Sequence, residues 1–442
     1  MLAGRRGAPG VTPLVTNLSF GLAGPRCGQS SSIRSRVERL HGGEVRFLRK
    51  GPSVLHGALG DGGAVMGTAV DGDLSLVYHG LFWNRLPEWP GGSTPIDHPD
   101  TTASYLLERF RRRDVGFLDG LSGQFSATVV DASNGRLVLG CEGAGMRRLF
   151  VHRRGDEVLF ASKLSAMVAL LGDDAEVDRG LEDFLLGFEF LPWGRTVYKG
   201  VEILDAGSVL DWRAGEASVR TLERATGYAD RWEGVQLDDE DDGRAGDLLH
   251  DALQETLDEQ IPSAGRVGVL LGGFDSALVA ALLVGRGKKV ETFSFSFDRA
   301  GYNQPLVDEA VRGLGIEHHW IAMTPEVLRS GLESYATSFH QPASQPHYLI
   351  QTAAVCAAMR RRGLLHAFSG DGCDGLFLGY PTVYRRARLI DRLSAIPKPF
   401  VRLALAASAL PPLEPLLGHP YRLGRNVLQI LLRDMPARGH IA

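Results

Sequence analysis

The first half of the chain consists of short apolar runs separated by turn residues. From Val45 to about Arg220, runs such as "AVMGTAV", "LSLVYHGLFW", "GQFSATVVD" and "GRLVLGC" alternate with turn segments such as "DASNGR". Runs of this length bounded by Gly, Asn and Asp predict strands joined by hairpins. Apolar residues at helical spacing over Thr101–Arg113 and Asp178–Phe188 predict helices between the strands. We therefore expect a mixed α+β domain here.

The second half has a different pattern, in which helices and strands alternate. The stretch "AGDLLHDALQETLDEQI" has helical spacing, Val267–Leu271 is an apolar run, a helix starts at Asp275, and "KVETFSFSF" reads as a strand. A second series follows, with strands at "HHWIAM" and "LLHAFSG" and a helical tail after Tyr380. Strands separated by helices in this way predict a parallel α/β sheet.

A polar, acidic stretch lies between the two patterns. The residues "EGVQLDDEDDGRAGD" cannot bury enough apolar surface to form a core, so they are the best candidate for a linker. We place one domain at 1–232, the linker at 233–245 and a second domain at 246–442. A length of 442 residues with 44% hydrophobic residues also favours two domains.

Composition excludes several classes of function. A net charge of −4 leaves no large basic surface for nucleic acid, and no apolar run is long enough to span a bilayer. The cysteines form no C-x-x-C pair, so neither a zinc site nor a disulfide framework is indicated. We expect a protein of the reducing cytoplasm. The four cysteines are Cys27, Cys141, Cys356 and Cys373.

The turn after the first strand of the second domain is a candidate phosphate site. Gly272 and Gly273 let backbone N–H groups approach an anion at the start of a helix, and Ser276 adds a hydroxyl. Asp275 is placed to hold a divalent cation. The alternative is a tight turn in which Asp275 caps a core helix, and the local pattern leaves both interpretations open. A Walker A loop is excluded because its Lys-Ser/Thr pair is absent.

A second acidic loop favours the phosphate interpretation. "FSGDGCDGLFLGY", Phe368–Tyr380, also follows an apolar strand and carries Asp371 and Asp374. In a parallel sheet both loops leave the same carboxyl-terminal edge, where ligands usually bind. The two carboxylates could then join Asp275 around one metal ion and a polyphosphate. A solvated, glycine-rich turn is the alternative for this loop taken alone.

At these two loops the chain resembles the asparagine synthase family. That family carries a Ser-Gly-Gly-x-Asp-Ser loop, here Leu271–Ser276, and a later Ser-Gly-Glu-Gly-Ala-Asp-Glu-Leu-Phe-Gly-Gly-Tyr loop, here Ser369–Tyr380. "TFSFSF" is similar to its adenine-side strand and "LGIEHHWI" to its Leu-Gly-x-x-His-His segment. The resemblance implies Mg²⁺ held by Asp275 and Asp374, and Asp371, in place of a Glu, as the base for the amine. The implied contacts to ATP and pyrophosphate are Leu270, Gly272, Gly273, Asp275, Ser276, Phe295, Ser296, Ser369 and Gly370.

The first domain is similar to the glutaminase-like half of the same family. The resemblance implies an α+β sandwich of the N-terminal-nucleophile type, followed by an α/β parallel-sheet adenine-nucleotide-binding domain with a helical tail. The nucleophile itself is missing, because Leu2 stands where the family has Cys, and Cys27 could serve only after removal of the preceding residues. His79–Asn84 stands for the family's Asn-Gly-Glu-x-x-Asn, and Lys163 replaces the Glu of Phe-Ala-Ser-Glu. Asp100 matches the acid that reads the amine of glutamine. We expect no glutamine hydrolysis.

The nucleotide-binding half also departs from the family. Leu271 replaces the first serine of its loop and Gly375 replaces a Glu. The sequence ends at Ala442, before the helical region in which the family keeps a catalytic lysine, so we expect a short C-terminus that another chain could complete.

The resemblance implies an ATP-dependent, amide-bond-forming ligase that forms AMP and pyrophosphate and needs ATP and Mg²⁺. Members without the nucleophile, such as β-lactam synthetases and lasso-peptide cyclases, favour specialised metabolite or macrolactam-type peptide synthesis. The expected partner is a small-molecule or peptide carboxylate, with a homo-oligomer or a partner protein as further possibilities. Two alternatives stay open: amidation of aspartate with ammonia, as in a conventional asparagine synthetase, and a non-catalytic nucleotide- or partner-binding protein.

Overall fold

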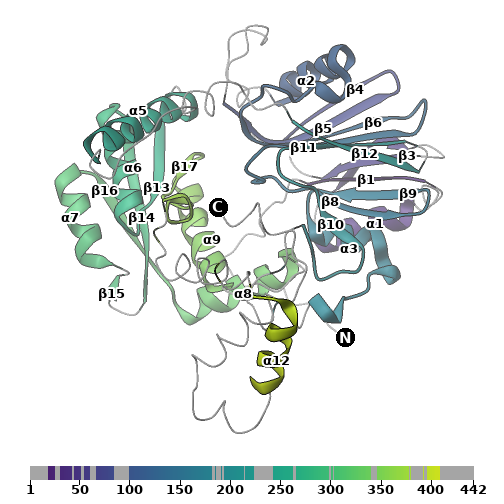
Figure 1. Ribbon diagram of the computed structural model, residues 1–442. Coiled ribbons are helices and arrows are strands. Elements are labelled where there is room, and N and C mark those ends of the chain that lie inside the picture. Colours follow the sequence, from purple (N-terminus) through teal and green to yellow (C-terminus); the bar gives the residue numbers. More distant parts are fainter. Residues whose placement is uncertain are drawn as a thin grey trace. The chain divides into compact units, whose positions relative to one another are not determined.

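A computed structural model shows two compact units (Figure 1). The first unit contains Met1–Leu185, Phe190–Gly265 and Ala322–Arg362, and the second contains Leu186–Glu189, Arg266–Ile321 and Gly363–Ala442. Neither unit is continuous in sequence. The predicted linker over 233–245 is described only from residue 242 onward. The structure describes residues 18–24, 30–41, 44–50, 54–59, 66–83, 99–181, 185, 191, 194–213, 215–222, 242–261, 265–297, 300–301, 303–339, 346–377, 379, 392 and 396–408.

The first unit contains two six-stranded sheets with antiparallel pairing. One sheet has the order β10-β8-β9-β1-β3-β2 and the other has the order β12-β11-β7-β6-β5-β4. The strands of the first sheet are β1 (Leu18–Ala23), β2 (Val45–Lys50), β3 (Val54–Leu59), β8 (Phe150–Arg154), β9 (Glu157–Ala161) and β10 (Val201–Ile203). Those of the second are β4 (Met66–Asp71), β5 (Leu74–Phe82), β6 (Gly123–Asp131), β7 (Arg136–Cys141), β11 (Ser208–Arg213) and β12 (Glu216–Thr221).

These sheets and their helices form an α/β/β/α sandwich, as Figure 1 shows for this unit. Helices α1 (Ser30–His41) and α3 (Leu164–Leu171) share a core with β1, β3 and β9. Helix α2 (Pro99–Arg113), followed by the short 3₁₀ turn η4 (Asp114–Gly116), shares another with β5 and β6. A third core of residues from both sheets fills the space between them. The predicted N-terminal-nucleophile-type α+β fold is confirmed.

Strand β1 is an element that the sequence patterns did not predict. It lies in the interior of its sheet, pairs with both β3 and β9, and is buried along its whole length. Its six residues "LSFGLA" stand in a Gly- and Pro-rich region, so they lack the flanking turn pattern that marked the other strands. The predicted helix over Asp178–Phe188 falls largely outside the described residues.

Three more helices belong to the first unit: α5 (Asp242–Gln260), α8 (Pro325–Phe339) and α9 (Pro346–Arg361). Helices α8 and α9 pack closely. A Cβ atom at Gly331 of α8 would lie only 2.4 Å from Cγ2 of Ile350 in α9. The 3₁₀ turn η5 (Gly172–Asp174) follows α3. Within the described residues, no helix has the length and apolarity needed to cross a membrane.

The second unit is built on the predicted parallel sheet. Strand β13 (Arg266–Leu270) pairs in parallel with β14 (Lys289–Phe297) and with β17 (Ala367–Phe368). Strands β15 (Ala300–Gly301) and β16 (Glu317–Ala322) both pair with β14. The helices are α6 (Phe274–Gly285), α7 (Gln304–Leu314), α10 (Cys373–Leu376) and α12 (Lys398–Ser408). The order of strand, helix and parallel strand is the one expected from the sequence.

Candidate functional site

Two loops of the second unit begin at the same edge of its sheet. In the parallel pairing of β13 with β17, Val269 lies opposite Phe368. The first loop follows Leu270 and leads into α6, and the second loop follows Phe368 and leads into α10. Both loops therefore start within about one residue of each other in register, at the carboxyl ends of neighbouring strands. Ligands of open α/β sheets bind at such edges.

The two loops are in direct contact through Gly370. A Cβ atom at this position would lie 2.7 Å from the backbone nitrogen of Ser276 and 2.8 Å from Cβ of Asp275. Distances this short leave no room for any side chain, so glycine is required for the approach. The second loop thus lies against the first turn of α6, where Asp275 and Ser276 are located.

Ser276 organises the first loop from within. Its Oγ accepts hydrogen bonds from the N–H groups of Gly272 (3.0 Å) and Gly273 (3.1 Å) and donates to the carbonyl of Gly273 (3.0 Å). The side chain is only 5% exposed. The two glycine amides and this hydroxyl are therefore hydrogen-bonded within the turn itself, at the N-terminus of α6. An anion at this helix end would have to replace these bonds.

Asn303 is a loop residue that sequence reasoning missed. Its side-chain amide donates a hydrogen bond to the carbonyl of Gly272 at 2.8 Å, and its own backbone is left-handed, with φ of 50°. Left-handed backbone is common for Asn at a turn, and "NQP" before a helical pattern could have marked the start of α7. Nothing in the sequence indicates the contact with Gly272, because the two residues lie on different elements.

Three carboxylates gather around Cys373 in the second loop. Burial first, and then the charges of Asp275, Asp374 and Asp371, raise the pKa of the Cys373 thiol above its ordinary value. The three predicted aspartates therefore all act on Cys373, although two come from one loop and Asp275 from the other. Asp275 and Asp374 are partly buried and Asp371 is exposed. Carboxylate oxygens are the ligands that Mg²⁺ prefers. No three ligand atoms of this group lie within 4.8 Å of one another, so a metal ion between these carboxylates stays a prediction.

The remaining predicted residues lie on the same edge or on the neighbouring strand. Leu270 ends β13, opposite Phe293 of β14. Phe295 and Ser296 lie further along β14 and are partly buried. Ser369 is exposed, and its Oγ accepts a hydrogen bond from the N–H of Asp371 at 3.3 Å. Contacts of these residues with a nucleotide stay predictions.

Leu271 is a packing residue in this structure. Its side chain is 2% exposed, its N–H donates to the carbonyl of Phe293 at 2.8 Å, and its carbonyl accepts a hydrogen bond from Ser294. The substitution of a serine by leucine therefore leaves the start of the loop anchored to β14. Gly375 has open space around its Cα and is an exposed residue of α10.

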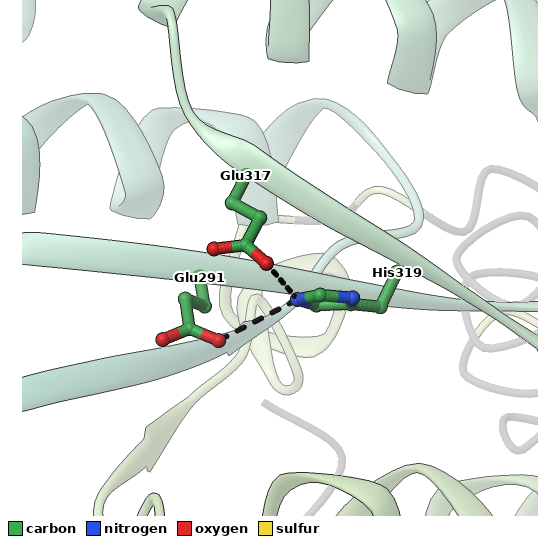
Figure 2. A group of neighbouring side chains, drawn as sticks. All are labelled: Glu291, Glu317 and His319. Carbon is green, nitrogen blue, oxygen red and sulfur yellow. Dashed lines mark ion pairs between the residues drawn. The ribbon is translucent and has the colours of Figure 1, made fainter. Parts of the chain in front are cut away.

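A further polar group lies near the start of β14 and β16 (Figure 2). Nε2 of His319 lies between the carboxylates of Glu317 (3.2 Å) and buried Glu291 (3.4 Å). Three side chains of this kind could hold a metal ion in principle. However, Arg266 pairs with Glu291 at 2.5 Å and compensates the buried carboxylate. The group is therefore accounted for as an ion-pair network of the sheet.

In the first unit, several residues of the expected glutamine site lie outside the described residues. Leu2, Cys27 and Asn84 belong to segments that the structure does not describe. Asp100 lies at the start of α2, where its Oδ1 accepts a hydrogen bond from the N–H of Thr68 at 3.2 Å.

Comparison with known proteins finds two domains in the chain. An asparagine synthase domain matches residues 248–434, and a glutamine amidotransferase domain matches residues 68–223. A putative glutamine-hydrolysing asparagine synthetase of Mycobacterium tuberculosis (strain ATCC 25618 / H37Rv) is 26% identical over 339 residues, which cover 74% of this chain and 50% of the relative. A second protein of that description, from Methanocaldococcus jannaschii, is 22% identical over 78% of this chain and 66% of its own length.

The match thus spans about half the length of the mycobacterial relative. Among solved structures, the glutamine phosphoribosylpyrophosphate amidotransferase from B. subtilis is 12% identical, with a TM-score of 0.28 over 80% of this chain and 90% of that one. Two domain matches in the family's order, together with relatives that align across both halves, agree with the loops and sheets described above. The chain belongs to the asparagine synthase family.

Proposed function

We propose that this protein is an ATP-dependent ligase that joins a carboxylate to an amine. In the first step a carboxylate oxygen bonds to the α-phosphorus of ATP, and the bond from that phosphorus to pyrophosphate breaks. In the second step the amine nitrogen bonds to the activated carbon, the bond to AMP breaks, and a base takes the proton. The observation that carries the proposal is the contact at Gly370, which joins the acidic loop to the first turn of α6.

The residues of the first loop would hold the phosphates. The N–H groups of Gly272 and Gly273 and the hydroxyl of Ser276 lie at the N-terminus of α6, where they would exchange their present bonds within the turn for bonds to pyrophosphate. Ser369 and Gly370 would add contacts from the second loop. Leu270, Phe295 and Ser296 lie on β13 and β14 and would flank the adenosine. Each of these contacts is part of the proposal.

The acidic group has two proposed roles. Asp275 and Asp374 would hold Mg²⁺, which supplies positive charge to the phosphates as pyrophosphate leaves. Asp371 is the exposed member of the group and would accept the proton of the incoming amine. Asp275 and Asp374 would thus serve the adenylation step, and the exposed Asp371 would serve the attack of the amine.

The amine is proposed to come from the substrate itself or from free ammonia and not from glutamine. His79 and Lys163 stand where the family has Asn and Glu, so the amidotransferase half lacks the groups that the resemblance implies for glutamine. Synthesis of a specialised metabolite or a macrolactam-type peptide fits a substrate amine, whereas amidation of aspartate fits ammonia. A small-molecule or peptide carboxylate is the partner in each case.

ATP–pyrophosphate exchange against a panel of amino acids and peptide acids tests the proposal, because the acid that is adenylated promotes exchange. We expect exchange with at least one acid, and its loss in Asp275→Asn. Asp251→Asn at an exposed position of α5 is the matched control and should keep it. Binding of Mg-ATP without exchange by any acid would instead support a non-catalytic nucleotide-binding protein.

A further inference from the structure

A second charged group lies in the first unit, far in sequence from the loops described above. His79 is on β5, Arg147 follows β7, and Lys163 follows β9 and precedes α3. We call these three residues the basic cluster. Burial first, and then the charges of Arg147 and Lys163, lower the pKa of His79 to about 3. Strand β5, which carries His79, lies against β1 of the other sheet.

His79 carries a buried polar atom without a partner. The side chain is 7% exposed, and its Nε2 has no hydrogen-bond partner within the described part of the chain. Tyr78 belongs to the core beneath α2, so the alternation of a strand turns His79 to the opposite face, toward the other sheet. Buried polar atoms are nearly always hydrogen-bonded in folded proteins, so an unpaired one indicates a missing partner.

Ser19 provides a second atom of this kind. It is fully buried, and its Oγ has no partner among the described residues. Its N–H donates to Oγ of Ser162 at 2.9 Å, which places Ser19 beside the residue that precedes Lys163. Leu18 and Phe20 point into the core with α1 and α3, so Ser19 faces the space between the sheets.

The two cations of the cluster lie near a single described acid. Neither Arg147 nor Lys163 forms an ion pair with any residue that the structure describes. The neighbouring acid is the buried Glu142, but its two oxygens accept the N–H groups of Ala144 (2.6 Å) and Arg147 (3.0 Å). Burial and the charge on Arg147 lower the pKa of Lys163 to about 8. Among the described residues, Arg147, Lys163 and Glu142 together therefore carry a net positive charge.

We propose that the basic cluster binds a small carboxylate monoanion, held by Arg147 and Lys163 and hydrogen-bonded by His79 and Ser19. Two cations and one acid leave a single positive charge, which matches a monoanion better than a phosphate dianion. Arg147 reaches solvent and gives the ligand access. At positions 79 and 163 this chain has exchanged an amide and an acid for an imidazole and an ammonium group. This proposal is independent of the reaction at the loops.

Selective acetylation of lysine tests the site at the level of one residue. The full-length protein is treated at pH 7 with a limiting amount of N-hydroxysuccinimidyl acetate, with or without acetate, lactate, benzoate or N-acetylglycine at constant ionic strength, and labelling is read by peptide mass spectrometry. A carboxylate that raises the pKa of Lys163 by one unit lowers its reactive fraction about tenfold. The matched control is Lys199, an exposed lysine paired with Glu176, and its labelling should not change.

Variants then connect the protection to the cluster. The rise in Tm given by the protecting carboxylate should disappear in Lys163→Met, persist in Lys163→Arg and persist in Lys199→Met. The proposal is overturned if none of the four carboxylates protects Lys163, if Lys199 is protected equally, or if Lys163→Met retains the rise in Tm. Protection by inorganic phosphate alone would overturn the assignment to a carboxylate.

Discussion

The acidic group of the second unit and the basic cluster of the first differ in how much of the family pattern each retains. Asp275 and Asp374 keep the residue types of the family motifs, and the glycines around them keep the close contact between the loops. In the basic cluster, His79 and Lys163 differ from the residue types of the family motifs, while the described residues of the sandwich around them form packed apolar cores. The difference teaches that the sandwich can keep its cores while a polar residue such as that at position 163 changes the sign of its charge.

The largest effect is expected from Asp275→Asn. Loss of one carboxylate from the proposed metal group should lower ATP–pyrophosphate exchange by about 10³-fold, because charge on the phosphates is no longer neutralised. Steady-state exchange rates measure it. If Asp275→Asn retained the wild-type rate, the acidic group would have no greater role in catalysis than the exposed Asp251.

Gly370→Ala tests the contact between the loops. A methyl group would clash with Ser276 and Asp275, so one loop must shift, and misplacement of this size costs up to about 10²-fold in rate. Gly375→Ala is the matched control, because a Cβ atom at that position would have nothing within 4 Å. Equal exchange rates in the two variants would show that the contact at Gly370 has no bearing on the reaction.

Leu271→Ser restores the family residue and distinguishes an effect of Leu271 on stability from an effect on the exchange rate. Removal of a buried side chain should lower the free energy of unfolding by about 2 kcal/mol, with little gain in exchange. Denaturant unfolding measures the change, and Leu278→Ser on the exposed face of α6 is the control. A large gain in exchange without loss of stability would mean that Leu271 weakens the phosphate site.

Lys163→Met should have the smallest effect, and in the opposite direction. The pKa of Lys163 is lowered to about 8 from 10.5, so below pH 8 the folded state bears the full penalty of a buried charge. Between pH 8 and 10.5 the folded protein loses this proton while the unfolded chain keeps it, and the penalty fades. Lys163→Met should therefore add about 1 kcal/mol of stability at pH 7, less than the full shift because the residue is partly exposed, and less still at about pH 10.

Urea unfolding at the two pH values measures this difference, with Lys199→Met as the control that should change little. A loss of stability in Lys163→Met at pH 7 would show that the ammonium group has a favourable partner in the protein itself. The basic cluster would then carry less net positive charge, and its contrast with the acidic group of the second unit would be smaller.

Much of the fold could be predicted from the sequence because its strands and helices have clear periodicity. The parallel order of β13, β14 and β17 follows from apolar runs separated by helices, and it brought Asp275 and Asp374 to one edge. Strand β1 could not be predicted, since "LSFGLA" is short and lies in a Gly- and Pro-rich region.

The sequence motifs name the residues of the candidate site, whose role stays a prediction, but not the contacts among them. Motifs name Ser276 and Gly370, yet only packing shows that Gly370 touches the start of α6. The hydrogen bond from Asn303 joins elements that no local pattern relates. The net positive charge around Lys163 could not be predicted from the sequence, because it depends on which acids lie nearby in space.

The discontinuous composition of the two units has a consequence for synthesis on the ribosome. Helices α8 and α9 belong to the first unit but are encoded between β16 and β17 of the second. The first unit can therefore complete its packing only after Arg361 has left the exit tunnel. Until β17 is synthesised, the edge of β13 with which it pairs stays open. Unpaired strand edges of nascent chains attract other chains, so this family member should depend on chaperones during translation more than a protein with two successive domains.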